Sequence, residues 1–156
     1  MVGLPVLILL ASGLALATAL VAQYVFGLDP CALCVWQRWP YVAALGIGLL
    51  GWVFRLPVWL VALAGFAAFA ATAGVGMFHA GVEQGWWQGL ATCAGADTPD
   101  TVEALRAQLM GKQPARCDAI PFSFLGLSIA GWNVVYAGGM ALLTLYLGFR
   151  RCGGRI

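Results

Sequence analysis

Two cysteines separated by two residues, Cys31 and Cys34, are the part of this sequence with the clearest chemical potential. Pro30 precedes them, which favours an extended approach followed by the start of a helix. The free N–H groups and the positive dipole end of such a helix would stabilise a thiolate. The spacing therefore indicates a reactive dithiol. A purely structural disulfide is the alternative, but it would close too short a loop to constrain the chain much.

Arg38 lies four residues after Cys34, so the two side chains share a helix face. The helical rise puts Arg38 about 6 Å further along the helix. If this helix crosses a membrane, a charge at that depth indicates a functional site. Arg38 would stabilise the Cys34 thiolate, or donate to an oxygen of a bound ligand that becomes negative on reduction. An arginine that extends to the lipid headgroups is the alternative.

A second pair, Cys93 and Cys117, lies in the one long polar stretch of the chain. Alone, such a pair is typical of an ordinary disulfide in a secreted protein. Beside Cys31 and Cys34 it indicates a second redox pair that passes electrons by thiol–disulfide exchange. Cys152 lies in a basic tail, and we expect a free thiol without a role there.

Metal binding is the main competing chemistry for these cysteines. Four of them could hold zinc, but the paired second half of a zinc ribbon is missing. Attachment of c-type haem needs a histidine where Val35 stands, and His79 is the only histidine of the chain. We therefore expect no metal. His79 itself would contact a bound ligand or relay a proton, with a solvated interfacial histidine as the alternative.

The composition places the chain in a lipid bilayer. Its residues are 62% hydrophobic and only 9% charged, whereas soluble proteins carry roughly 25% charged residues. No basic cluster interleaved with aromatic residues indicates nucleic-acid binding. Four apolar segments are long enough to cross a membrane. We expect one all-α domain over residues 1–156, a four-transmembrane-helix bundle with spans at about 4–26, 35–54, 56–78 and 122–149.

Charged residues predict the orientation of these spans. One side of the membrane receives only basic residues: Arg55 in the turn between spans two and three, and Arg150, Arg151 and Arg155 after span four. The loop at about 79–121 carries more acidic than basic residues. Both termini are therefore expected in the cytoplasm, and both cysteine pairs on the outer side. In a bacterium that side is the periplasm, where disulfides persist.

Two further polar features fall within this layout. Asp100 and Glu103 have the spacing of a helix capping box, and Val102, Leu105 and Leu109 follow on one helical face. They predict a short amphipathic helix in the loop, lying on the membrane surface or packed on the bundle. Asn133, in the middle of the last span, is expected to form an interhelical hydrogen bond.

The cysteine motif resembles that of a known family. Residues 30–38, PCALCVWQR, are similar to the P-C-x-L-C-x-x-x-R signature of the bacterial disulfide bond formation protein B (DsbB) family. Residues 124–128, FLGLS, and the pair Trp132 and Asn133 resemble the start of the fourth helix in that family. The four spans and the second cysteine pair occur in the same order. This resemblance covers nearly the whole chain.

The resemblance implies an activity and a route for electrons. A periplasmic DsbA-like protein, in its reduced form, would attack Cys93, and the released Cys117 would exchange with Cys31. Cys34, with Arg38 and His79 nearby, would then pass the electrons to a membrane quinone, either ubiquinone or menaquinone. The chain would thus be a protein-dithiol:quinone oxidoreductase of the bacterial inner membrane.

Two other interpretations remain open from the sequence. A vitamin K epoxide reductase-like protein also couples cysteines to quinones in a four-helix bundle. It usually carries its CxxC motif on a late helix, whereas here the motif opens the second span. A membrane scaffold stapled by disulfides would need no reactive thiol at all.

Overall fold

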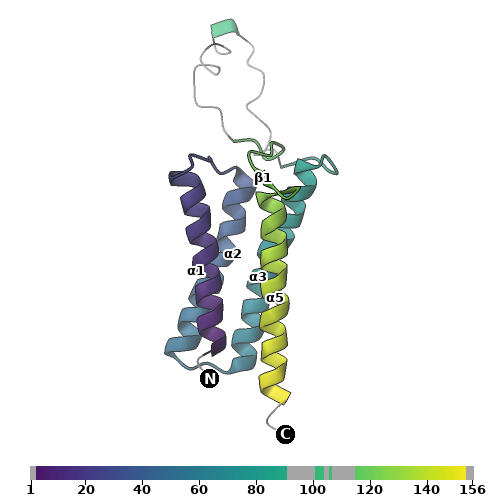
Figure 1. The fold of residues 1–156 in the computed structure, drawn as a ribbon. Coiled ribbons are helices and arrows are strands. Elements are labelled where there is room, and N and C mark those ends of the chain that lie inside the picture. Colours follow the sequence, from purple (N-terminus) through teal and green to yellow (C-terminus); the bar gives the residue numbers. More distant parts are fainter. Residues whose placement is uncertain (1–2, 91–100, 104–105, 107–114, 154–156) are drawn as a thin grey trace.

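The computed structural model describes residues 3–90, 101–103, 106 and 115–153. In this part of the chain the fold is a bundle of four long helices with one small hairpin (Figure 1). The elements are α1 (Gly3–Tyr24), α2 (Ala32–Val53), α3 (Val58–Glu83), β1 (Ser123–Phe124), β2 (Leu127–Ser128) and α5 (Ile129–Gly153). The predicted all-α four-helix bundle is confirmed.

The four helices run alternately up and down. The end of α2 connects to α3 through a tight turn, where Arg55 has a positive φ of 51°. The helix α3 packs mainly against α5, while α2 packs against both α1 and α3. The start of α1 and the end of α5 lie at one end of the bundle, and the start of α2 lies at the other (Figure 1).

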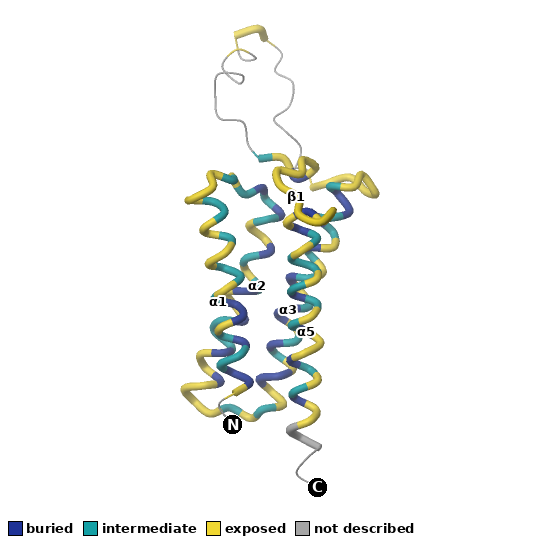
Figure 2. The backbone as a smooth tube through the Cα atoms, in the orientation of Figure 1, coloured by how far each residue is buried: buried dark blue, intermediate teal, exposed yellow. Residues whose placement is uncertain are grey.

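The outward faces of the helices are apolar. Leu10, Leu14, Val53 and Leu142 are each more than half exposed, as side chains that contact lipid would be. Figure 2 shows that the buried positions lie on the sides that face other helices. By length and hydropathy α1, α3 and α5 are each able to cross a membrane, and the 22-residue α2, which carries Gln37 and Arg38, matches them in length.

Buried apolar side chains fill the space between the helices. Leu4 and Ile8 of α1 belong to one buried cluster with Val61 and Phe69 of α3, and all four are essentially inaccessible. The ring of Tyr41 lies edge-on to Phe69, with 6.0 Å between the ring centroids. Within this core α2 approaches α1 closely, because Gly48 has no side chain to keep the backbones apart.

Two helix boundaries differ from the predicted span limits. The helix α3 continues to Glu83, beyond the predicted limit at Phe78, so His79 belongs to the helix and not to the loop. The helix α5 begins at Ile129 and not near residue 122, because a hairpin precedes it. Leu125 and Gly126 form its turn with φ values of 52° and 79°. Their left-handed backbone interrupts the helix, although most residues of the segment are apolar.

The predicted amphipathic helix falls mostly outside the described residues. Thr101, Val102, Glu103 and Arg106 are described, and Val102, Glu103 and Arg106 have helical backbone. The exposed side chain of Val102 does not decide between a membrane-surface position and packing on the bundle. This helix therefore stays a prediction.

The close approach of α1 and α2 at Gly48 predicts a defined stability loss. A Cβ atom there would lie 2.8 Å from two backbone atoms of α1, the amide nitrogen of Leu9 and the carbonyl oxygen of Pro5. Neither can move without shifting the helix. We expect Gly48→Ala to destabilise the protein by about 1–3 kcal/mol, measured as thermal unfolding in detergent.

Gly46 provides the matched control on the same helix. A Cβ atom at Gly46 would meet nothing within 4 Å, so Gly46→Ala should leave the unfolding temperature unchanged or slightly higher. Equal unfolding temperatures for the two variants would contradict the close packing of α1 and α2.

Candidate active site

The thiol pair lies at the start of α2. Cys31 is the N-cap residue, with φ −72° and ψ 171°, and its sulfur accepts a hydrogen bond from the backbone N–H of Cys34 at 3.3 Å. Both residues are free thiols, and their sulfur atoms lie 3.1 Å apart. The predicted helix start at this motif is confirmed. The residue Cys31 is buried, while Cys34 is partly exposed.

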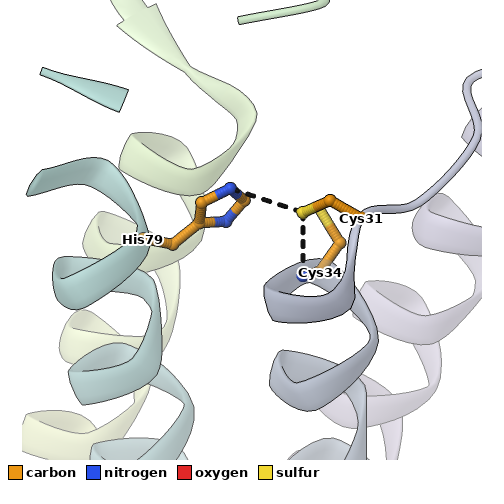
Figure 3. A group of neighbouring side chains, drawn as sticks. All are labelled: Cys31, Cys34 and His79. Atoms are coloured by element: carbon orange, nitrogen blue, oxygen red, sulfur yellow. Dashed lines mark hydrogen bonds between the residues drawn. The ribbon is translucent and has the colours of Figure 1, made fainter. Parts of the chain in front are cut away.

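His79 of α3 faces this pair across the bundle. Its Nε2 atom lies 3.5 Å from the sulfur of Cys31, as the dashed line in Figure 3 marks. The side chain is buried, with 3% of its surface exposed. The alternative of a solvated interfacial histidine is therefore wrong. The span predicted from hydropathy stopped at Phe78, so the prediction left His79 outside the bundle.

A chain of polar side chains continues from His79 into the bundle. Gln37 of α2 places its Nε2 atom 2.9 Å from Nδ1 of His79. Asn133 of α5 donates from Nδ2 to Oε1 of Gln37 at 2.7 Å. The hydroxyl of Tyr41 then donates to Oδ1 of Asn133 at 2.6 Å. The predicted interhelical hydrogen bond of Asn133 is confirmed, and its partners on α2 are Gln37 and Tyr41.

Glu83 is a member of the site that the sequence analysis did not identify. Its carboxylate Oε1 lies 3.8 Å from Nε2 of His79, and its side chain is 3% exposed. The hydroxyl of Ser128 in β2 donates to the other oxygen, Oε2. The signal was available, since positions four apart share a helix face. Glu83 could have been recognised as a neighbour of His79 only if the predicted helix had been extended past Phe78.

Cys117 lies beside the thiol pair. It is completely buried and packs in a small cluster with Cys31, Leu33 and Val82. Cys117 is in a disulfide, and its backbone lies within hydrogen-bonding reach of His79. Cys93, its predicted partner, lies outside the described residues. Of the four predicted redox cysteines, the structure describes Cys31, Cys34 and Cys117, and it brings these three together.

An ion pair brackets Cys117. Arg116 donates from Nε and from its terminal nitrogen to the two carboxylate oxygens of Asp118, at 2.9 and 2.6 Å. The guanidinium beside it holds the pKa of Asp118 below its usual range. Both side chains are exposed, so the pair contributes little to stability. Its effect is local, because it restrains the turn that carries the buried cysteine.

Arg38 contacts a different helix from His79. Its guanidinium donates to Oε1 of Gln23, near the end of α1, at 2.7 Å. This bond orients the charge one turn below Cys34, on the side of the pair that faces α1. His79 approaches the pair from α3. Arg38 of α2 is thus directed at α1, whereas His79, which was predicted to contact the same ligand, approaches from α3.

The environment of Cys31 favours its thiolate. The hydrogen bond with the Cys34 thiol is the largest influence, and it lowers the pKa of Cys31, which lies just outside α2, to about 4. Burial opposes this shift, while His79 and the backbone N–H of Cys34 add to it. A nucleophilic thiol needs this type of environment.

The same three side chains also have the composition of a metal site. The donor atoms of Cys31, Cys34 and His79 lie within 4.8 Å of one another. Two thiolates and one imidazole are ligands that a thiophilic ion such as Zn²⁺ prefers. Whether the histidine nitrogen is available as a ligand depends on where its proton is held.

The chain was compared with known proteins. The family model for "Disulfide bond formation protein DsbB" matches residues 3–147. Three relatives are each described as disulfide bond formation protein B. The protein of Paracidovorax citrulli is 32% identical, over 85% of this chain and 78% of its own length. The protein of Xanthomonas campestris pv. campestris strain 8004 is 32% identical, over 90% and 86%.

The protein of Dechloromonas aromatica is 33% identical, over 96% of this chain and 89% of its own length. No solved structure matches this chain significantly. The family model covers α1, α2, α3 and most of α5, and with them the described residues of the site.

The low pKa of Cys31 predicts an unusual pH dependence of its reactivity. A thiol with a pKa near 4 stays ionised as the pH falls from 8 to about 6. The thiolate fraction of an ordinary thiol, with a pKa of about 8.5, falls roughly tenfold for each pH unit in the same range. Alkylation of Cys31 in the reduced protein, followed by mass spectrometry, should therefore be almost independent of pH in this range.

Two variants rank the causes of this shift. Cys34→Ala removes the largest favourable contact, so it should raise the pKa of Cys31 more than His79→Ala does. The reverse order of the two variants would contradict the assigned causes of the low pKa. An alkylation rate of Cys31 that falls tenfold for each pH unit in the unchanged protein would contradict the low pKa itself.

Proposed function

The chain belongs to the DsbB family of disulfide bond formation proteins, and from this premise we propose that it is a membrane protein-dithiol:quinone oxidoreductase. Membership implies a role in disulfide bond formation. The substrate would be a reduced, DsbA-like periplasmic dithiol protein. One observation carries the proposal: a free thiol pair at a helix start lies against the buried, disulfide-bonded Cys117.

In the proposed route, electrons move between the two cysteine pairs by exchange. A thiolate of the partner attacks Cys93 of a Cys93–Cys117 disulfide, so that a mixed disulfide forms and Cys117 leaves as a thiolate. Cys117 then attacks the sulfur of Cys31 in a Cys31–Cys34 disulfide. The Cys31–Cys34 bond breaks, and Cys34 leaves with the electron pair. The contact of Cys117 with the Cys31 cluster supports this order.

Resolution of both mixed disulfides completes the cycle. The second thiol of the partner attacks the partner's own sulfur in its mixed disulfide with Cys93. That bond breaks, which releases the oxidised partner and the Cys93 thiolate. That thiolate attacks Cys117 and frees Cys31. The loop disulfide is then restored, and the electrons rest on Cys31 and Cys34. The free thiols of α2 beside a disulfide-bonded Cys117 match this stage.

The residues around Cys34 fit a quinone as the electron acceptor. Cys34 is the more exposed residue of the pair, which is compatible with a ligand that arrives from the bilayer. Arg38, held by Gln23, supplies a cationic donor one turn below it. A bound quinone would accept two electrons and two protons. Arg38 would hold the oxygen that gains negative charge, and His79 would hold a proton near Cys31.

The proposed location is the bacterial inner membrane, with both termini in the cytoplasm and the thiol pair facing the periplasm. Arg55 and Arg150 support this orientation, since α2 ends before Arg55 and α5 carries Arg150 at its last turns. These helix ends lie opposite the start of α2 (Figure 1), where the thiol pair is located. Basic residues concentrate on the cytoplasmic side of membrane proteins.

Cys34 tests the last step of the proposed route. We expect Cys34→Ser to abolish quinone reduction, because the remaining Cys31 cannot form a disulfide with a serine hydroxyl. The measurement is ubiquinone or menaquinone absorbance with purified protein and reduced DsbA. Cys152→Ser, which removes a cysteine far along the sequence from both pairs, should turn over normally. Normal turnover of Cys34→Ser would refute the route.

Arg38 tests the acceptor site. We expect Arg38→Ala to raise the KM for quinone about tenfold or more, since a hydrogen bond to a charged group contributes about 1.5–3 kcal/mol. Arg55→Ala removes the same side chain at the opposite end of α2 and should leave the KM unchanged. An unchanged KM for Arg38→Ala would reduce Arg38 to a residue that anchors the helix at the membrane surface.

A further inference from the structure

Polar side chains from three helices meet inside the apolar bundle. Gln37 and Tyr41 come from α2, Thr72 and His79 from α3, and Asn133 from α5. Gln37, Tyr41, Thr72 and His79 are all less than 9% exposed. Among the residues that the structure describes, no buried side-chain nitrogen or oxygen lacks a hydrogen-bond partner. The direction of each bond in this set can therefore be followed from one side chain to the next.

Thr72 determines which way the Asn133 amide points. The backbone carbonyl of Thr72 can only accept, and it lies 3.5 Å from Nδ2 of Asn133. The Thr72 hydroxyl, also 3.5 Å from Nδ2, already donates to the carbonyl of Gln37 at 2.9 Å, so it too is left to accept. The amide nitrogen of Asn133 must face these two acceptors. Its Oδ1 atom then faces the hydroxyl of Tyr41.

The orientation of the Asn133 amide determines that of the Gln37 amide, which contacts His79. Because Asn133 donates to Oε1 of Gln37, the amide nitrogen of Gln37 is the atom that faces Nδ1 of His79, at 2.9 Å. An amide nitrogen donates and never accepts, so Nδ1 must be the accepting nitrogen of the ring. A neutral imidazole with an accepting Nδ1 carries its proton on Nε2.

We propose that Asn133 is a positioning residue that, through Gln37, holds His79 in the tautomer with its proton on Nε2, directed at the sulfur of Cys31. Asn133 touches neither thiol. The distance from Nε2 to the Cys31 sulfur is 3.5 Å, within reach of a hydrogen bond to a thiolate. The proposal extends the proposed function, since it names what prepares Cys31 for exchange.

The charged and titratable groups around Nε2 fit this arrangement. A carboxylate oxygen of Glu83 on α3 lies 3.8 Å from Nε2, beyond hydrogen-bonding distance, and the other oxygen accepts from Ser128. Cys34 lies beyond Cys31 on α2, Arg38 is bonded to Gln23 of α1, and Cys117 is disulfide-bonded. A proton on Nε2 thus lies within hydrogen-bonding distance of the Cys31 sulfur, and the carboxylate of Glu83 is further away.

The same proton weighs against a metal site. Cys31, Cys34 and His79 have suitable donor types, but the histidine atom in the cluster that faces the sulfur is Nε2. A protonated ring nitrogen has no lone pair for a metal. Metal-binding histidines also donate their other N–H to an acceptor, whereas here Nδ1 faces the donating amide of Gln37. The hydrogen bonds favour a thiolate–imidazole pair.

His79 is the only histidine, so one isotope label reports on the proposal directly. In the reduced, full-length protein in detergent micelles, ¹⁵N NMR of labelled histidine distinguishes the two neutral tautomers and the cation. We expect the form protonated on Nε2 alone at neutral pH. A ring protonated on Nδ1 alone, or on both nitrogens, would overturn the proposal. The measurement needs no quinone and no partner, so it stands apart from the test of the proposed function.

Variants of α5 separate positioning from a general structural effect. Asn133→Leu should release the Gln37 amide and produce a mixture of tautomers, and it should raise the pKa of Cys31 in alkylation by about one unit. Tyr136→Phe, on the same helix, removes the hydrogen bond to the carbonyl of Ala11 and should change neither. An unchanged tautomer in folded Asn133→Leu would refute the role of Asn133. If Asn133→Leu does not fold, the NMR spectrum of the unaltered protein still tests whether His79 carries its proton on Nε2 alone.

Discussion

A polar side chain inside a membrane bundle has no water to bind, so Gln37 has to find all its partners on neighbouring helices. It does so with α3 and α5 at once. Its side chain contacts His79 and Asn133, and its backbone carbonyl accepts from Thr72. These bonds fix how α2, α3 and α5 lie against each other at the level of the thiol pair. The position of His79, and with it the environment of Cys31, depends on this junction.

The large-scale fold follows from the sequence because the bilayer imposes a strong rule. A long apolar segment between polar ones has few alternatives to a spanning helix, and four such segments predict the bundle. Helix ends are less determined by that rule. The helix α3 keeps its hydrogen-bonded backbone through His79 and Glu83 although hydropathy falls there, and the apolar residues before α5 form a turn at Leu125 and Gly126.

The site was predictable where its chemistry is local. The spacing of Cys31 and Cys34 places both at the first turn of a helix, and the structure has them there. Partners that come from other helices were not predictable in the same way. Asn133 was expected to bond across helices, yet only the packing of α2 and α5 on α3 brings Gln37 and Tyr41 within its reach. Glu83 enters the site because α3 is longer than its apolar segment.

The two sulfurs of α2 are already close, 3.1 Å apart, with Cys31 at the cap and Cys34 in the first turn. A disulfide bond requires about 2 Å, so bond formation needs a movement of only about 1 Å. Side-chain rotation can supply that distance without unwinding the helix. The pair can therefore change its redox state on an almost stationary backbone, with a small reorganisation energy. Gln37, one turn further along, would keep its hydrogen bonds in both states.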